Sequence, residues 1–132
     1  MMFEDIKHRT VREHRTGDTR YRKWASLNMR RGKLHCFLAV SSDGRVAAGG
    51  CVWLKPIQPA PGRTAGDEPY LLSMYTEPEF RKNGLASRIV REAMKWAKSK
   101  GYQRMRLHAS PMGKKLYAEL GWERTMEMAI DL

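Results

Sequence analysis

The chain has 132 residues, of which 42% are hydrophobic and 30% are charged, so one globular domain is expected rather than a collagen, a coiled coil or a disordered chain. The net charge of +11 suits a polyanionic partner such as nucleic acid, an acidic protein or a polyphosphate, although a solvated surface explains it equally well. No apolar run is long enough to span a membrane and no secretory signal follows Met1, so we expect a cytoplasmic protein without membrane contact.

The two cysteines, Cys36 and Cys51, are too few for a disulfide scaffold or a four-cysteine zinc site. The histidines show no metal-ligand spacing with them, so no metal site is predicted. We expect both cysteines to be buried, as small apolar residues in a reducing compartment.

The first third of the chain predicts a helix. Residues 1–33 contain ten basic and four acidic residues, and their sparse apolar residues suggest one amphipathic helix. This helix is expected to start after Asp18 or Thr19 and to end near Gly32.

A hairpin should follow this helix. Residues 34–40 and 46–54 are two apolar runs separated by a turn with Asp43 and Gly44, which is a strong hairpin signal. The Gly49-Gly50 pair inside the second run predicts a bulge or a close approach of two backbones.

The middle of the chain predicts a strand, a helix and a second strand. A long loop rich in proline and glycine over residues 55–69 precedes a strand over 70–76. The spacing of the apolar residues then changes to that of a helix, and this helix is expected to start after Gly84 and to end at Gly101. A strand over 105–109 follows, and a crossover unit of this kind makes the two strands parallel.

The last part of the chain predicts a short helix and a final strand. Ser110 and Pro111 suit a cap and the first helical position, and Gly121 suits the end of that helix. Residues 122–130 then predict a last strand. The resulting order, α β β β α β α β, predicts an α/β protein with a mixed sheet.

The turn between the third strand and the long helix is the clearest candidate site. The start of a helix presents unbonded N–H groups and a positive dipole end, which together can hold phosphate. Gly84 lets a ligand approach the backbone, Asn83 tolerates a left-handed conformation, and Arg81 and Lys82 add charge. The turn has neither a Rossmann nor a Walker signature, and a basic turn that only starts a helix is the simpler alternative.

From about residue 36 to the end, the chain resembles the GNAT superfamily of acyl-CoA N-acyltransferases. The family motif Gln/Arg-x-x-Gly-x-Gly/Ala is matched by Arg81, Gly84 and Ala86. A later motif, aliphatic-Tyr-x-x-aliphatic-Gly-Phe, is matched over residues 116–122, with Trp122 in place of Phe. The resemblance implies a mixed, mostly antiparallel sheet with a splayed central pair of parallel strands and helices on both faces.

The resemblance also implies a function. One N-acetyltransferase domain over residues 1–132 would move an acetyl group from acetyl-CoA directly to an amine of a small molecule or protein. The diphosphate would sit on the amides of the turn, and the pantetheine would pair with the third strand like an added strand. The implied acetyl-CoA-binding residues are Met74, Tyr75, Thr76, Arg81, Lys82, Asn83, Gly84, Leu85, Ala86 and Ser87.

Tyr117 is the residue that the resemblance places against the departing sulfur. Gly113 lies one helical turn earlier, where we expect it to leave an open slot beside the ring. Tyrosine titrates near ~10 and a thiol near ~8.5, so a hydrogen bond to the thiolate is favoured over complete proton transfer. By spacing alone, Tyr117 is a core tyrosine with a solvated hydroxyl.

The general base and the acceptor stay open. Glu77, Glu79 and His108 are candidates for the base, although each is also explained as a surface or structural residue, and Ser73 is placed to hold a water. Family members usually have more residues before the first helix, and that part builds one wall of the acceptor site. A partner subunit in a homodimer is one source of the missing wall.

Two other functions remain as alternatives. A nucleic-acid-binding module would explain the basic first 33 residues and the scattered tryptophans, although no helix-turn-helix, RNP or zinc signature is present. A non-catalytic acyl-CoA sensor would explain the absence of an evident base.

Overall fold

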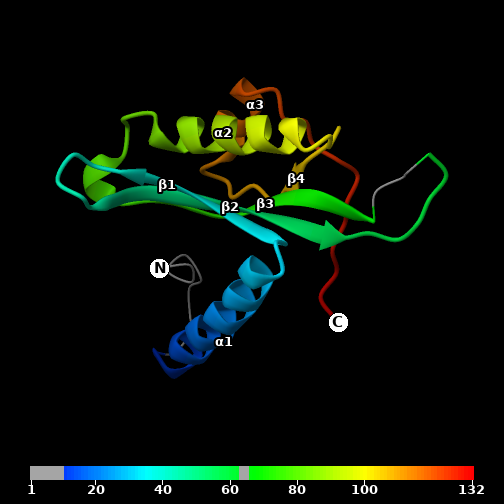
Figure 1. Cartoon of the computed structure of the whole chain (residues 1–132), viewed down its shortest axis with the longest axis horizontal. Coiled ribbons are helices and arrows are strands. Elements are labelled where there is room, and N and C mark those ends of the chain that lie inside the picture. Colours follow the sequence, from blue (N-terminus) through cyan, green and yellow to red (C-terminus); the bar gives the residue numbers. More distant parts are fainter. Residues whose placement is uncertain (1–10, 63–65) are drawn as a thin grey trace.

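The computed structural model describes residues 11–62 and 66–132, which form a four-stranded mixed sheet with helices on both faces (Figure 1). The elements in chain order are α1 (Val11–Arg30), β1 (Leu34–Val40), β2 (Val46–Pro56), β3 (Asp67–Thr76), the 3-10 helix η1 (Pro78–Phe80), α2 (Leu85–Ser99), β4 (Arg106–Leu107) and α3 (Lys114–Glu119). The predicted mixed α/β fold is confirmed. No helix in the described part of the chain is both long and apolar enough to cross a membrane.

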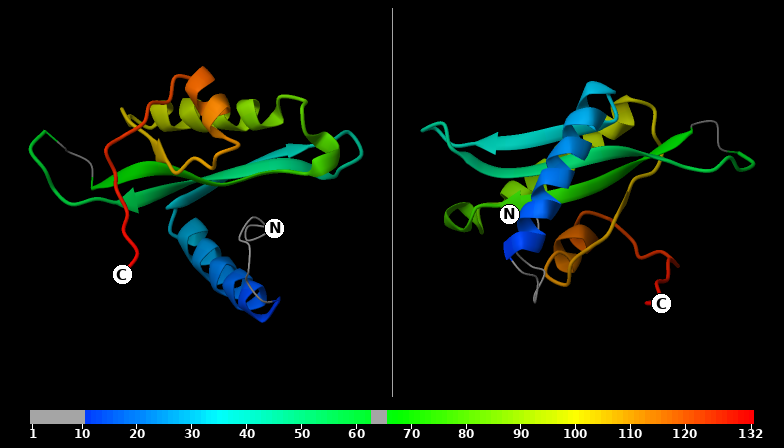
Figure 2. Two further views of the ribbon diagram at one scale, coloured as in Figure 1. Left: turned by 180° about the vertical axis from the view of Figure 1, so that it is seen from behind. Right: turned by 90° about the horizontal axis from the view of Figure 1, so that it is seen from below.

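The strands lie in the order β1-β2-β3-β4, and only the pair β3–β4 is parallel. The predicted hairpin joins β1 and β2, with the Ser41 N–H donating to the Arg45 carbonyl at 2.8 Å. The β3–β4 pairing consists of Tyr70 with Arg106 and Leu71 with Leu107, whereas β3 continues to Thr76. The chain leaves β4 for α3 where this pairing stops, so the parallel strands are splayed (Figure 2).

The two faces of the sheet are covered differently. Helices α2 and α3 lie on one face and α1 lies on the other (Figures 1 and 2). The predicted apolar stripe of α2 packs on the first face, where the core residues are Val52, Leu54, Leu71, Val90 and Ala93. On the second face, the Trp24 ring of α1 meets the Trp53 ring edge-on, with centroids 5.2 Å apart. Both faces of the sheet are thus covered by apolar contacts, and the core on the α2 side also includes partly buried aromatic residues such as Phe37, Trp96 and Tyr117.

The predicted irregularity at the paired glycines is present. The register of β2 against β3 shifts between Gly49 and Cys51, which is the signature of a bulge. A Cβ built on Gly50 would lie 2.9 Å from Cγ2 of Ile89 and would also overlap Met74. Gly50 therefore lets α2 approach the sheet at the point where the ladder is irregular.

Two element boundaries and the burial of one cysteine differ from the prediction in the first two-thirds of the chain. Helix α1 begins at Val11, well before Asp18, because arginine-rich sequence favours helix without needing an apolar stripe. The loop predicted over 55–69 is shorter, since β2 and β3 stay paired as far as Pro56 with Asp67. Cys36 is exposed rather than buried, and Cys51 is partly buried.

The predictions for the end of the chain are less accurate. Strand β4 has two residues instead of five, and Pro111 lies in a turn before α3 rather than in its first position. No strand forms over 122–130. Residues such as Met126 and Met128 alternate as strand residues do, but they are 94% and 93% exposed. An alternating sequence forms a strand only where a second strand supplies the hydrogen-bond partners. No strand in the described part of the chain pairs with this segment, although residues 125–127 lie near β3 and β4.

We predict that Gly50→Ala destabilises the fold by about 1–3 kcal/mol, because its methyl group would overpack the contact with Ile89. Gly49→Ala is the matched control. Its Cβ would meet Leu38 at 3.1 Å, and Leu38 is 61% exposed and free to move, so the change should stay within about 0.5 kcal/mol. Urea unfolding measures both, and equal losses of stability would contradict the assignment of Gly50 as the close-approach position.

Candidate active site

The end of β3 and the start of α2 are connected by a turn with internal hydrogen bonds. The Nε of Arg81 donates to the carbonyl of Thr76 at 3.2 Å, which ties the turn back to the end of the strand. The side-chain amide of Asn83 donates to the carbonyl of Phe80 at 3.1 Å. The predicted residues 74–76, at the end of β3, and 81–87, in the turn and the start of α2, therefore lie on adjacent segments.

Two residues of this turn have left-handed backbones. They are Lys82, with φ 66°, and Gly84, with φ 73°. The sequence predicted this conformation for Asn83, but Lys82 adopts it while Asn83 uses its side chain to bond the turn. A Cβ added to Gly84 would meet nothing within 4 Å, so glycine is required there by the backbone angle and the space beside it is open.

The first amides of α2 form a group of donors with no capping side chain among the described residues. The first helical hydrogen bond runs from the Arg88 N–H to the Gly84 carbonyl at 3.1 Å. The amides of Leu85, Ala86 and Ser87 precede that bond, and Gly84 before them is exposed. Successive amides in a turn that opens a helix form an anion-binding concavity, and the helix dipole adds partial positive charge.

The β1–β2 hairpin contacts the residues that precede this turn. Nη1 of Arg45 lies 2.8 Å from a carboxylate oxygen of Glu79, and its guanidinium lies 5.1 Å from the centroid of the Phe80 ring. The Glu77 N–H donates to the carbonyl of Ala47 at 2.8 Å. These contacts hold η1 against the sheet, and they engage the carboxylate of Glu79, one of the predicted candidates for the base.

The strand residues of the predicted site lie beyond the β4 pairing. Met74 contacts Gly50 beneath α2, Tyr75 pairs with Gly49, and Thr76 pairs with Ala48 across β2. All three strand residues are partly buried. The end of β3 is therefore paired with the bulged part of β2, and Met74 lies close to α2.

Ser73, just before these residues, has φ 58° and contacts a residue that the sequence did not reveal. Its hydroxyl hydrogen-bonds the Tyr21 hydroxyl of α1 at 2.5 Å. Burial raises the pKa of Tyr21 above its usual value, so its phenol stays neutral. No short-range pattern predicts this pair, because the two residues are 52 positions apart.

Tyr117 lies on α3, partly buried against the core. Its ring meets Trp122 edge-on, with centroids 6.0 Å apart. Burial raises the pKa of Tyr117, which keeps the phenol protonated as a hydrogen-bond donor at neutral pH. The slot predicted beside Gly113 is not open. A Cβ there would lie 2.8 Å from Cε2 of Tyr117, so the tyrosine ring itself occupies the space over the glycine.

The remaining candidate side chains lie on different segments of the chain. His108 is exposed on the segment after β4, and Glu77 is partly exposed at the start of the turn. Trp53, Trp96 and Trp122 pack against other rings, as expected for core tryptophans. Among the described residues, no group of three or more His, Cys, Asp or Glu side chains is arranged to hold a metal ion.

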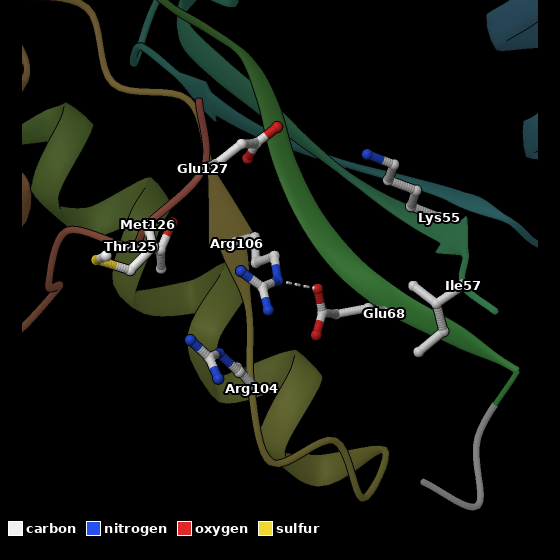
Figure 3. Close-up of a pocket in the computed structure, with 8 residues that line it drawn as sticks. All are labelled: Lys55, Ile57, Glu68, Arg104, Arg106, Thr125, Met126 and Glu127. Carbon is white, nitrogen blue, oxygen red and sulfur yellow. Dashed lines mark hydrogen bonds and ion pairs between the residues drawn. The ribbon is translucent and has the colours of Figure 1, made fainter. Parts of the chain in front are cut away.

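A cavity of about 480 Å³ lies away from this turn, beside the paired ends of β3 and β4 (Figure 3). It is lined by Lys55, Ile57, Glu68, Arg104, Arg106, Thr125, Met126 and Glu127. Figure 3 shows Arg106 directed at Glu68, and the two are joined by a 2.5 Å ion pair. None of the predicted site residues lines this cavity, and one of its cations is already neutralised.

The fold is similar to those of solved acetyltransferases. A GCN5-related N-acetyltransferase from Ralstonia eutropha JMP134 matches with a TM-score of 0.82 and 24% identity, over 95% of this chain and 82% of that one. A predicted acetyltransferase from Clostridium acetobutylicum, solved with acetyl-CoA, matches with a TM-score of 0.77 and 23% identity, over 87% and 73%. An aminoglycoside N-acetyltransferase in complex with CoA matches with a TM-score of 0.68 and 21% identity, over 91% and 90%.

No match was found among curated proteins. The family model for the acetyltransferase (GNAT) family, however, matches residues 1–122, which is most of the sequence. This match includes the open start of α2, the splayed strands and Tyr117, and it confirms the predicted resemblance. The chain belongs to the acetyltransferase (GNAT) family.

Proposed function

We propose that this chain is an N-acetyltransferase that moves the acetyl group of acetyl-CoA directly to an amine, and that residues 1–132 act as one domain. The observation that carries the proposal is the uncapped, left-handed turn at the start of α2, tied by Arg81 to the end of β3. Membership of an acetyltransferase family supports the reaction class.

Binding of acetyl-CoA is proposed at this turn and strand. The diphosphate would accept hydrogen bonds from the amides of residues 82–87, with Arg81 and Lys82 adding charge. The pantetheine would run beside Met74, Tyr75 and Thr76, as an extended segment does when it adds to a sheet. Two proteins of similar fold were solved with acetyl-CoA and with CoA, which supports acetyl-CoA as the ligand of this chain.

The proposed chemistry needs no covalent intermediate on the protein. The acceptor nitrogen attacks the thioester carbonyl, a C–N bond forms, the C–S bond breaks and the amine proton passes to solvent or a base. The thiolate of CoA departs. The phenol of Tyr117, neutral because its burial raises its pKa, would donate a hydrogen bond to that sulfur.

The acceptor is proposed only as a class. A primary amine on a small molecule or on a protein fits the reaction, and the net charge of +11 mildly favours an acidic acceptor. One similar fold was solved with a bisubstrate analogue that joins CoA to an acetylneamine, which shows that this architecture accommodates a polar amine in that protein.

We predict that Gly84→Asp weakens CoA binding about tenfold or more, because a carboxylate would face the diphosphate beside the start of α2. Gly84→Asn is the matched control, since both residues tolerate the left-handed backbone and they differ in charge alone. Calorimetric titration with CoA measures both variants. Equal affinity of the two would reject the turn as the diphosphate site.

We predict that Tyr117→Phe lowers kcat about 10- to 100-fold, the value of a lost hydrogen bond to a charged atom. Affinity for CoA should stay near normal, because the phenol acts on the departing sulfur. The variant is assayed by thiol release with a panel of amines.

Tyr102→Phe is the control for that experiment. Its phenol donates to Asp67 at 2.7 Å and lies outside the proposed site, so kcat should not change. An unchanged kcat for Tyr117→Phe would remove Tyr117 from the mechanism.

A further inference from the structure

The β1–β2 hairpin brings the two cysteines of the chain together. Cys36 and Cys51 are directly opposite each other in the antiparallel register, and their sulfur atoms lie 2.9 Å apart. Both are free thiols. Opposed residues in antiparallel strands have Cα atoms about 4.5–5.5 Å apart, which falls within the range that a disulfide spans. The hairpin register therefore places the two thiols within reach of a disulfide.

We propose that Cys36 and Cys51 form an oxidation site, in which a peroxide converts the two thiols into a reversible intrachain disulfide. The Cys36 thiolate attacks one peroxide oxygen, which gives a sulfenic acid and releases water. The Cys51 sulfur then attacks the sulfenic sulfur and displaces a second water. Two thiols and one hydrogen peroxide thus become one disulfide and two waters.

The two cysteines have unequal surroundings, which fixes their order of reaction. Cys36 is exposed and can meet a dissolved oxidant, whereas Cys51 is partly covered by Tyr21 of α1. Burial, together with the neighbouring Cys36, raises the pKa of Cys51 to about 12. Burial is the largest cause of this rise and keeps Cys51 protonated at neutral pH, so the exposed Cys36 is the cysteine expected to react first with a dissolved oxidant.

Disulfide formation fits this pair better than metal binding does. Structural zinc takes four ligands, commonly cysteine and histidine. In the part of the chain that the structure describes, no group of three or more potential ligands is close enough to hold a metal ion. A pair of opposed thiols with no further ligand beside it among the described residues is suited to disulfide formation.

The dithiol lies close to the proposed active site. Tyr21 contacts Cys51, and its hydroxyl bonds Ser73 at 2.5 Å, one residue before Met74. The oxidation site therefore adjoins the strand proposed for pantetheine. The oxidation itself does not depend on acetyl transfer, and its test below uses neither CoA nor an amine.

The test is oxidation of the reduced, folded full chain with hydrogen peroxide, followed by alkylation with iodoacetamide under denaturing conditions and measurement of the intact mass. We expect a loss of two hydrogen atoms, no alkylation and no covalent dimer, with both alkylation sites restored by dithiothreitol. The chain has two cysteines only, so the number of alkyl groups added per chain reports the state of both thiols directly, whatever oxygen the methionines take up. Two alkylatable thiols, or a disulfide-linked dimer, would overturn the proposal.

Serine variants test the order of reaction. Cys51→Ser should leave a sulfenic acid on Cys36 that dimedone captures, whereas Cys36→Ser should leave Cys51 reduced. Rapid oxidation of Cys51 without Cys36 would contradict the assigned roles.

The chain unfolded in urea before addition of peroxide is the control for the fold. We expect disulfide formation to be at least about tenfold slower there, because the register no longer holds the sulfurs together. Equal rates in the folded and unfolded chain would show that the hairpin does not build the site.

Discussion

The backbone amides at the start of α2 are the feature on which the rest of this structure depends. Buried and half-buried amides need acceptors, and a helix leaves its first amides without partners in its own backbone. In most helices a side chain caps them. Here the preceding residue is Gly84 in a left-handed conformation, and no side chain among the described residues caps the helix. An anion is the partner that such a group of donors binds best.

The remainder of the fold holds this group in place. Gly50 allows α2 to lie close to the bulged sheet, and the apolar face of α2 buries Val90 completely against it. Arg45 anchors η1 through Glu79 and Phe80. Parallel pairing of β3 with β4 stops after Leu71, so β3 continues toward α2 without β4 beside it. The topology of the sheet thus places the end of β3 next to the start of α2.

Local signals predicted the elements that local chemistry determines. Asp43-Gly44 specified the hairpin, the glycine pair specified the bulge, and the apolar stripe after Gly84 specified α2. Tertiary pairing decided the rest. The segment after Trp122 has the alternation of a strand but does not pair with any strand of the described sheet, and the Tyr21–Ser73 contact joins residues far apart in sequence. The Cys36–Cys51 pair follows from the hairpin register, although composition alone suggested two buried thiols.

The most direct measurement is a titration of the ¹⁵N-labelled chain with CoA, followed by the amide resonances of individual residues. Binding of the diphosphate to the start of α2 predicts the largest shifts at the amides of Lys82 through Ser87. The cavity beside Arg104 and Arg106 offers a basic surface elsewhere on the same molecule. The largest shifts at those arginines, with the amides before and within the first turn of α2 unchanged, would contradict the account.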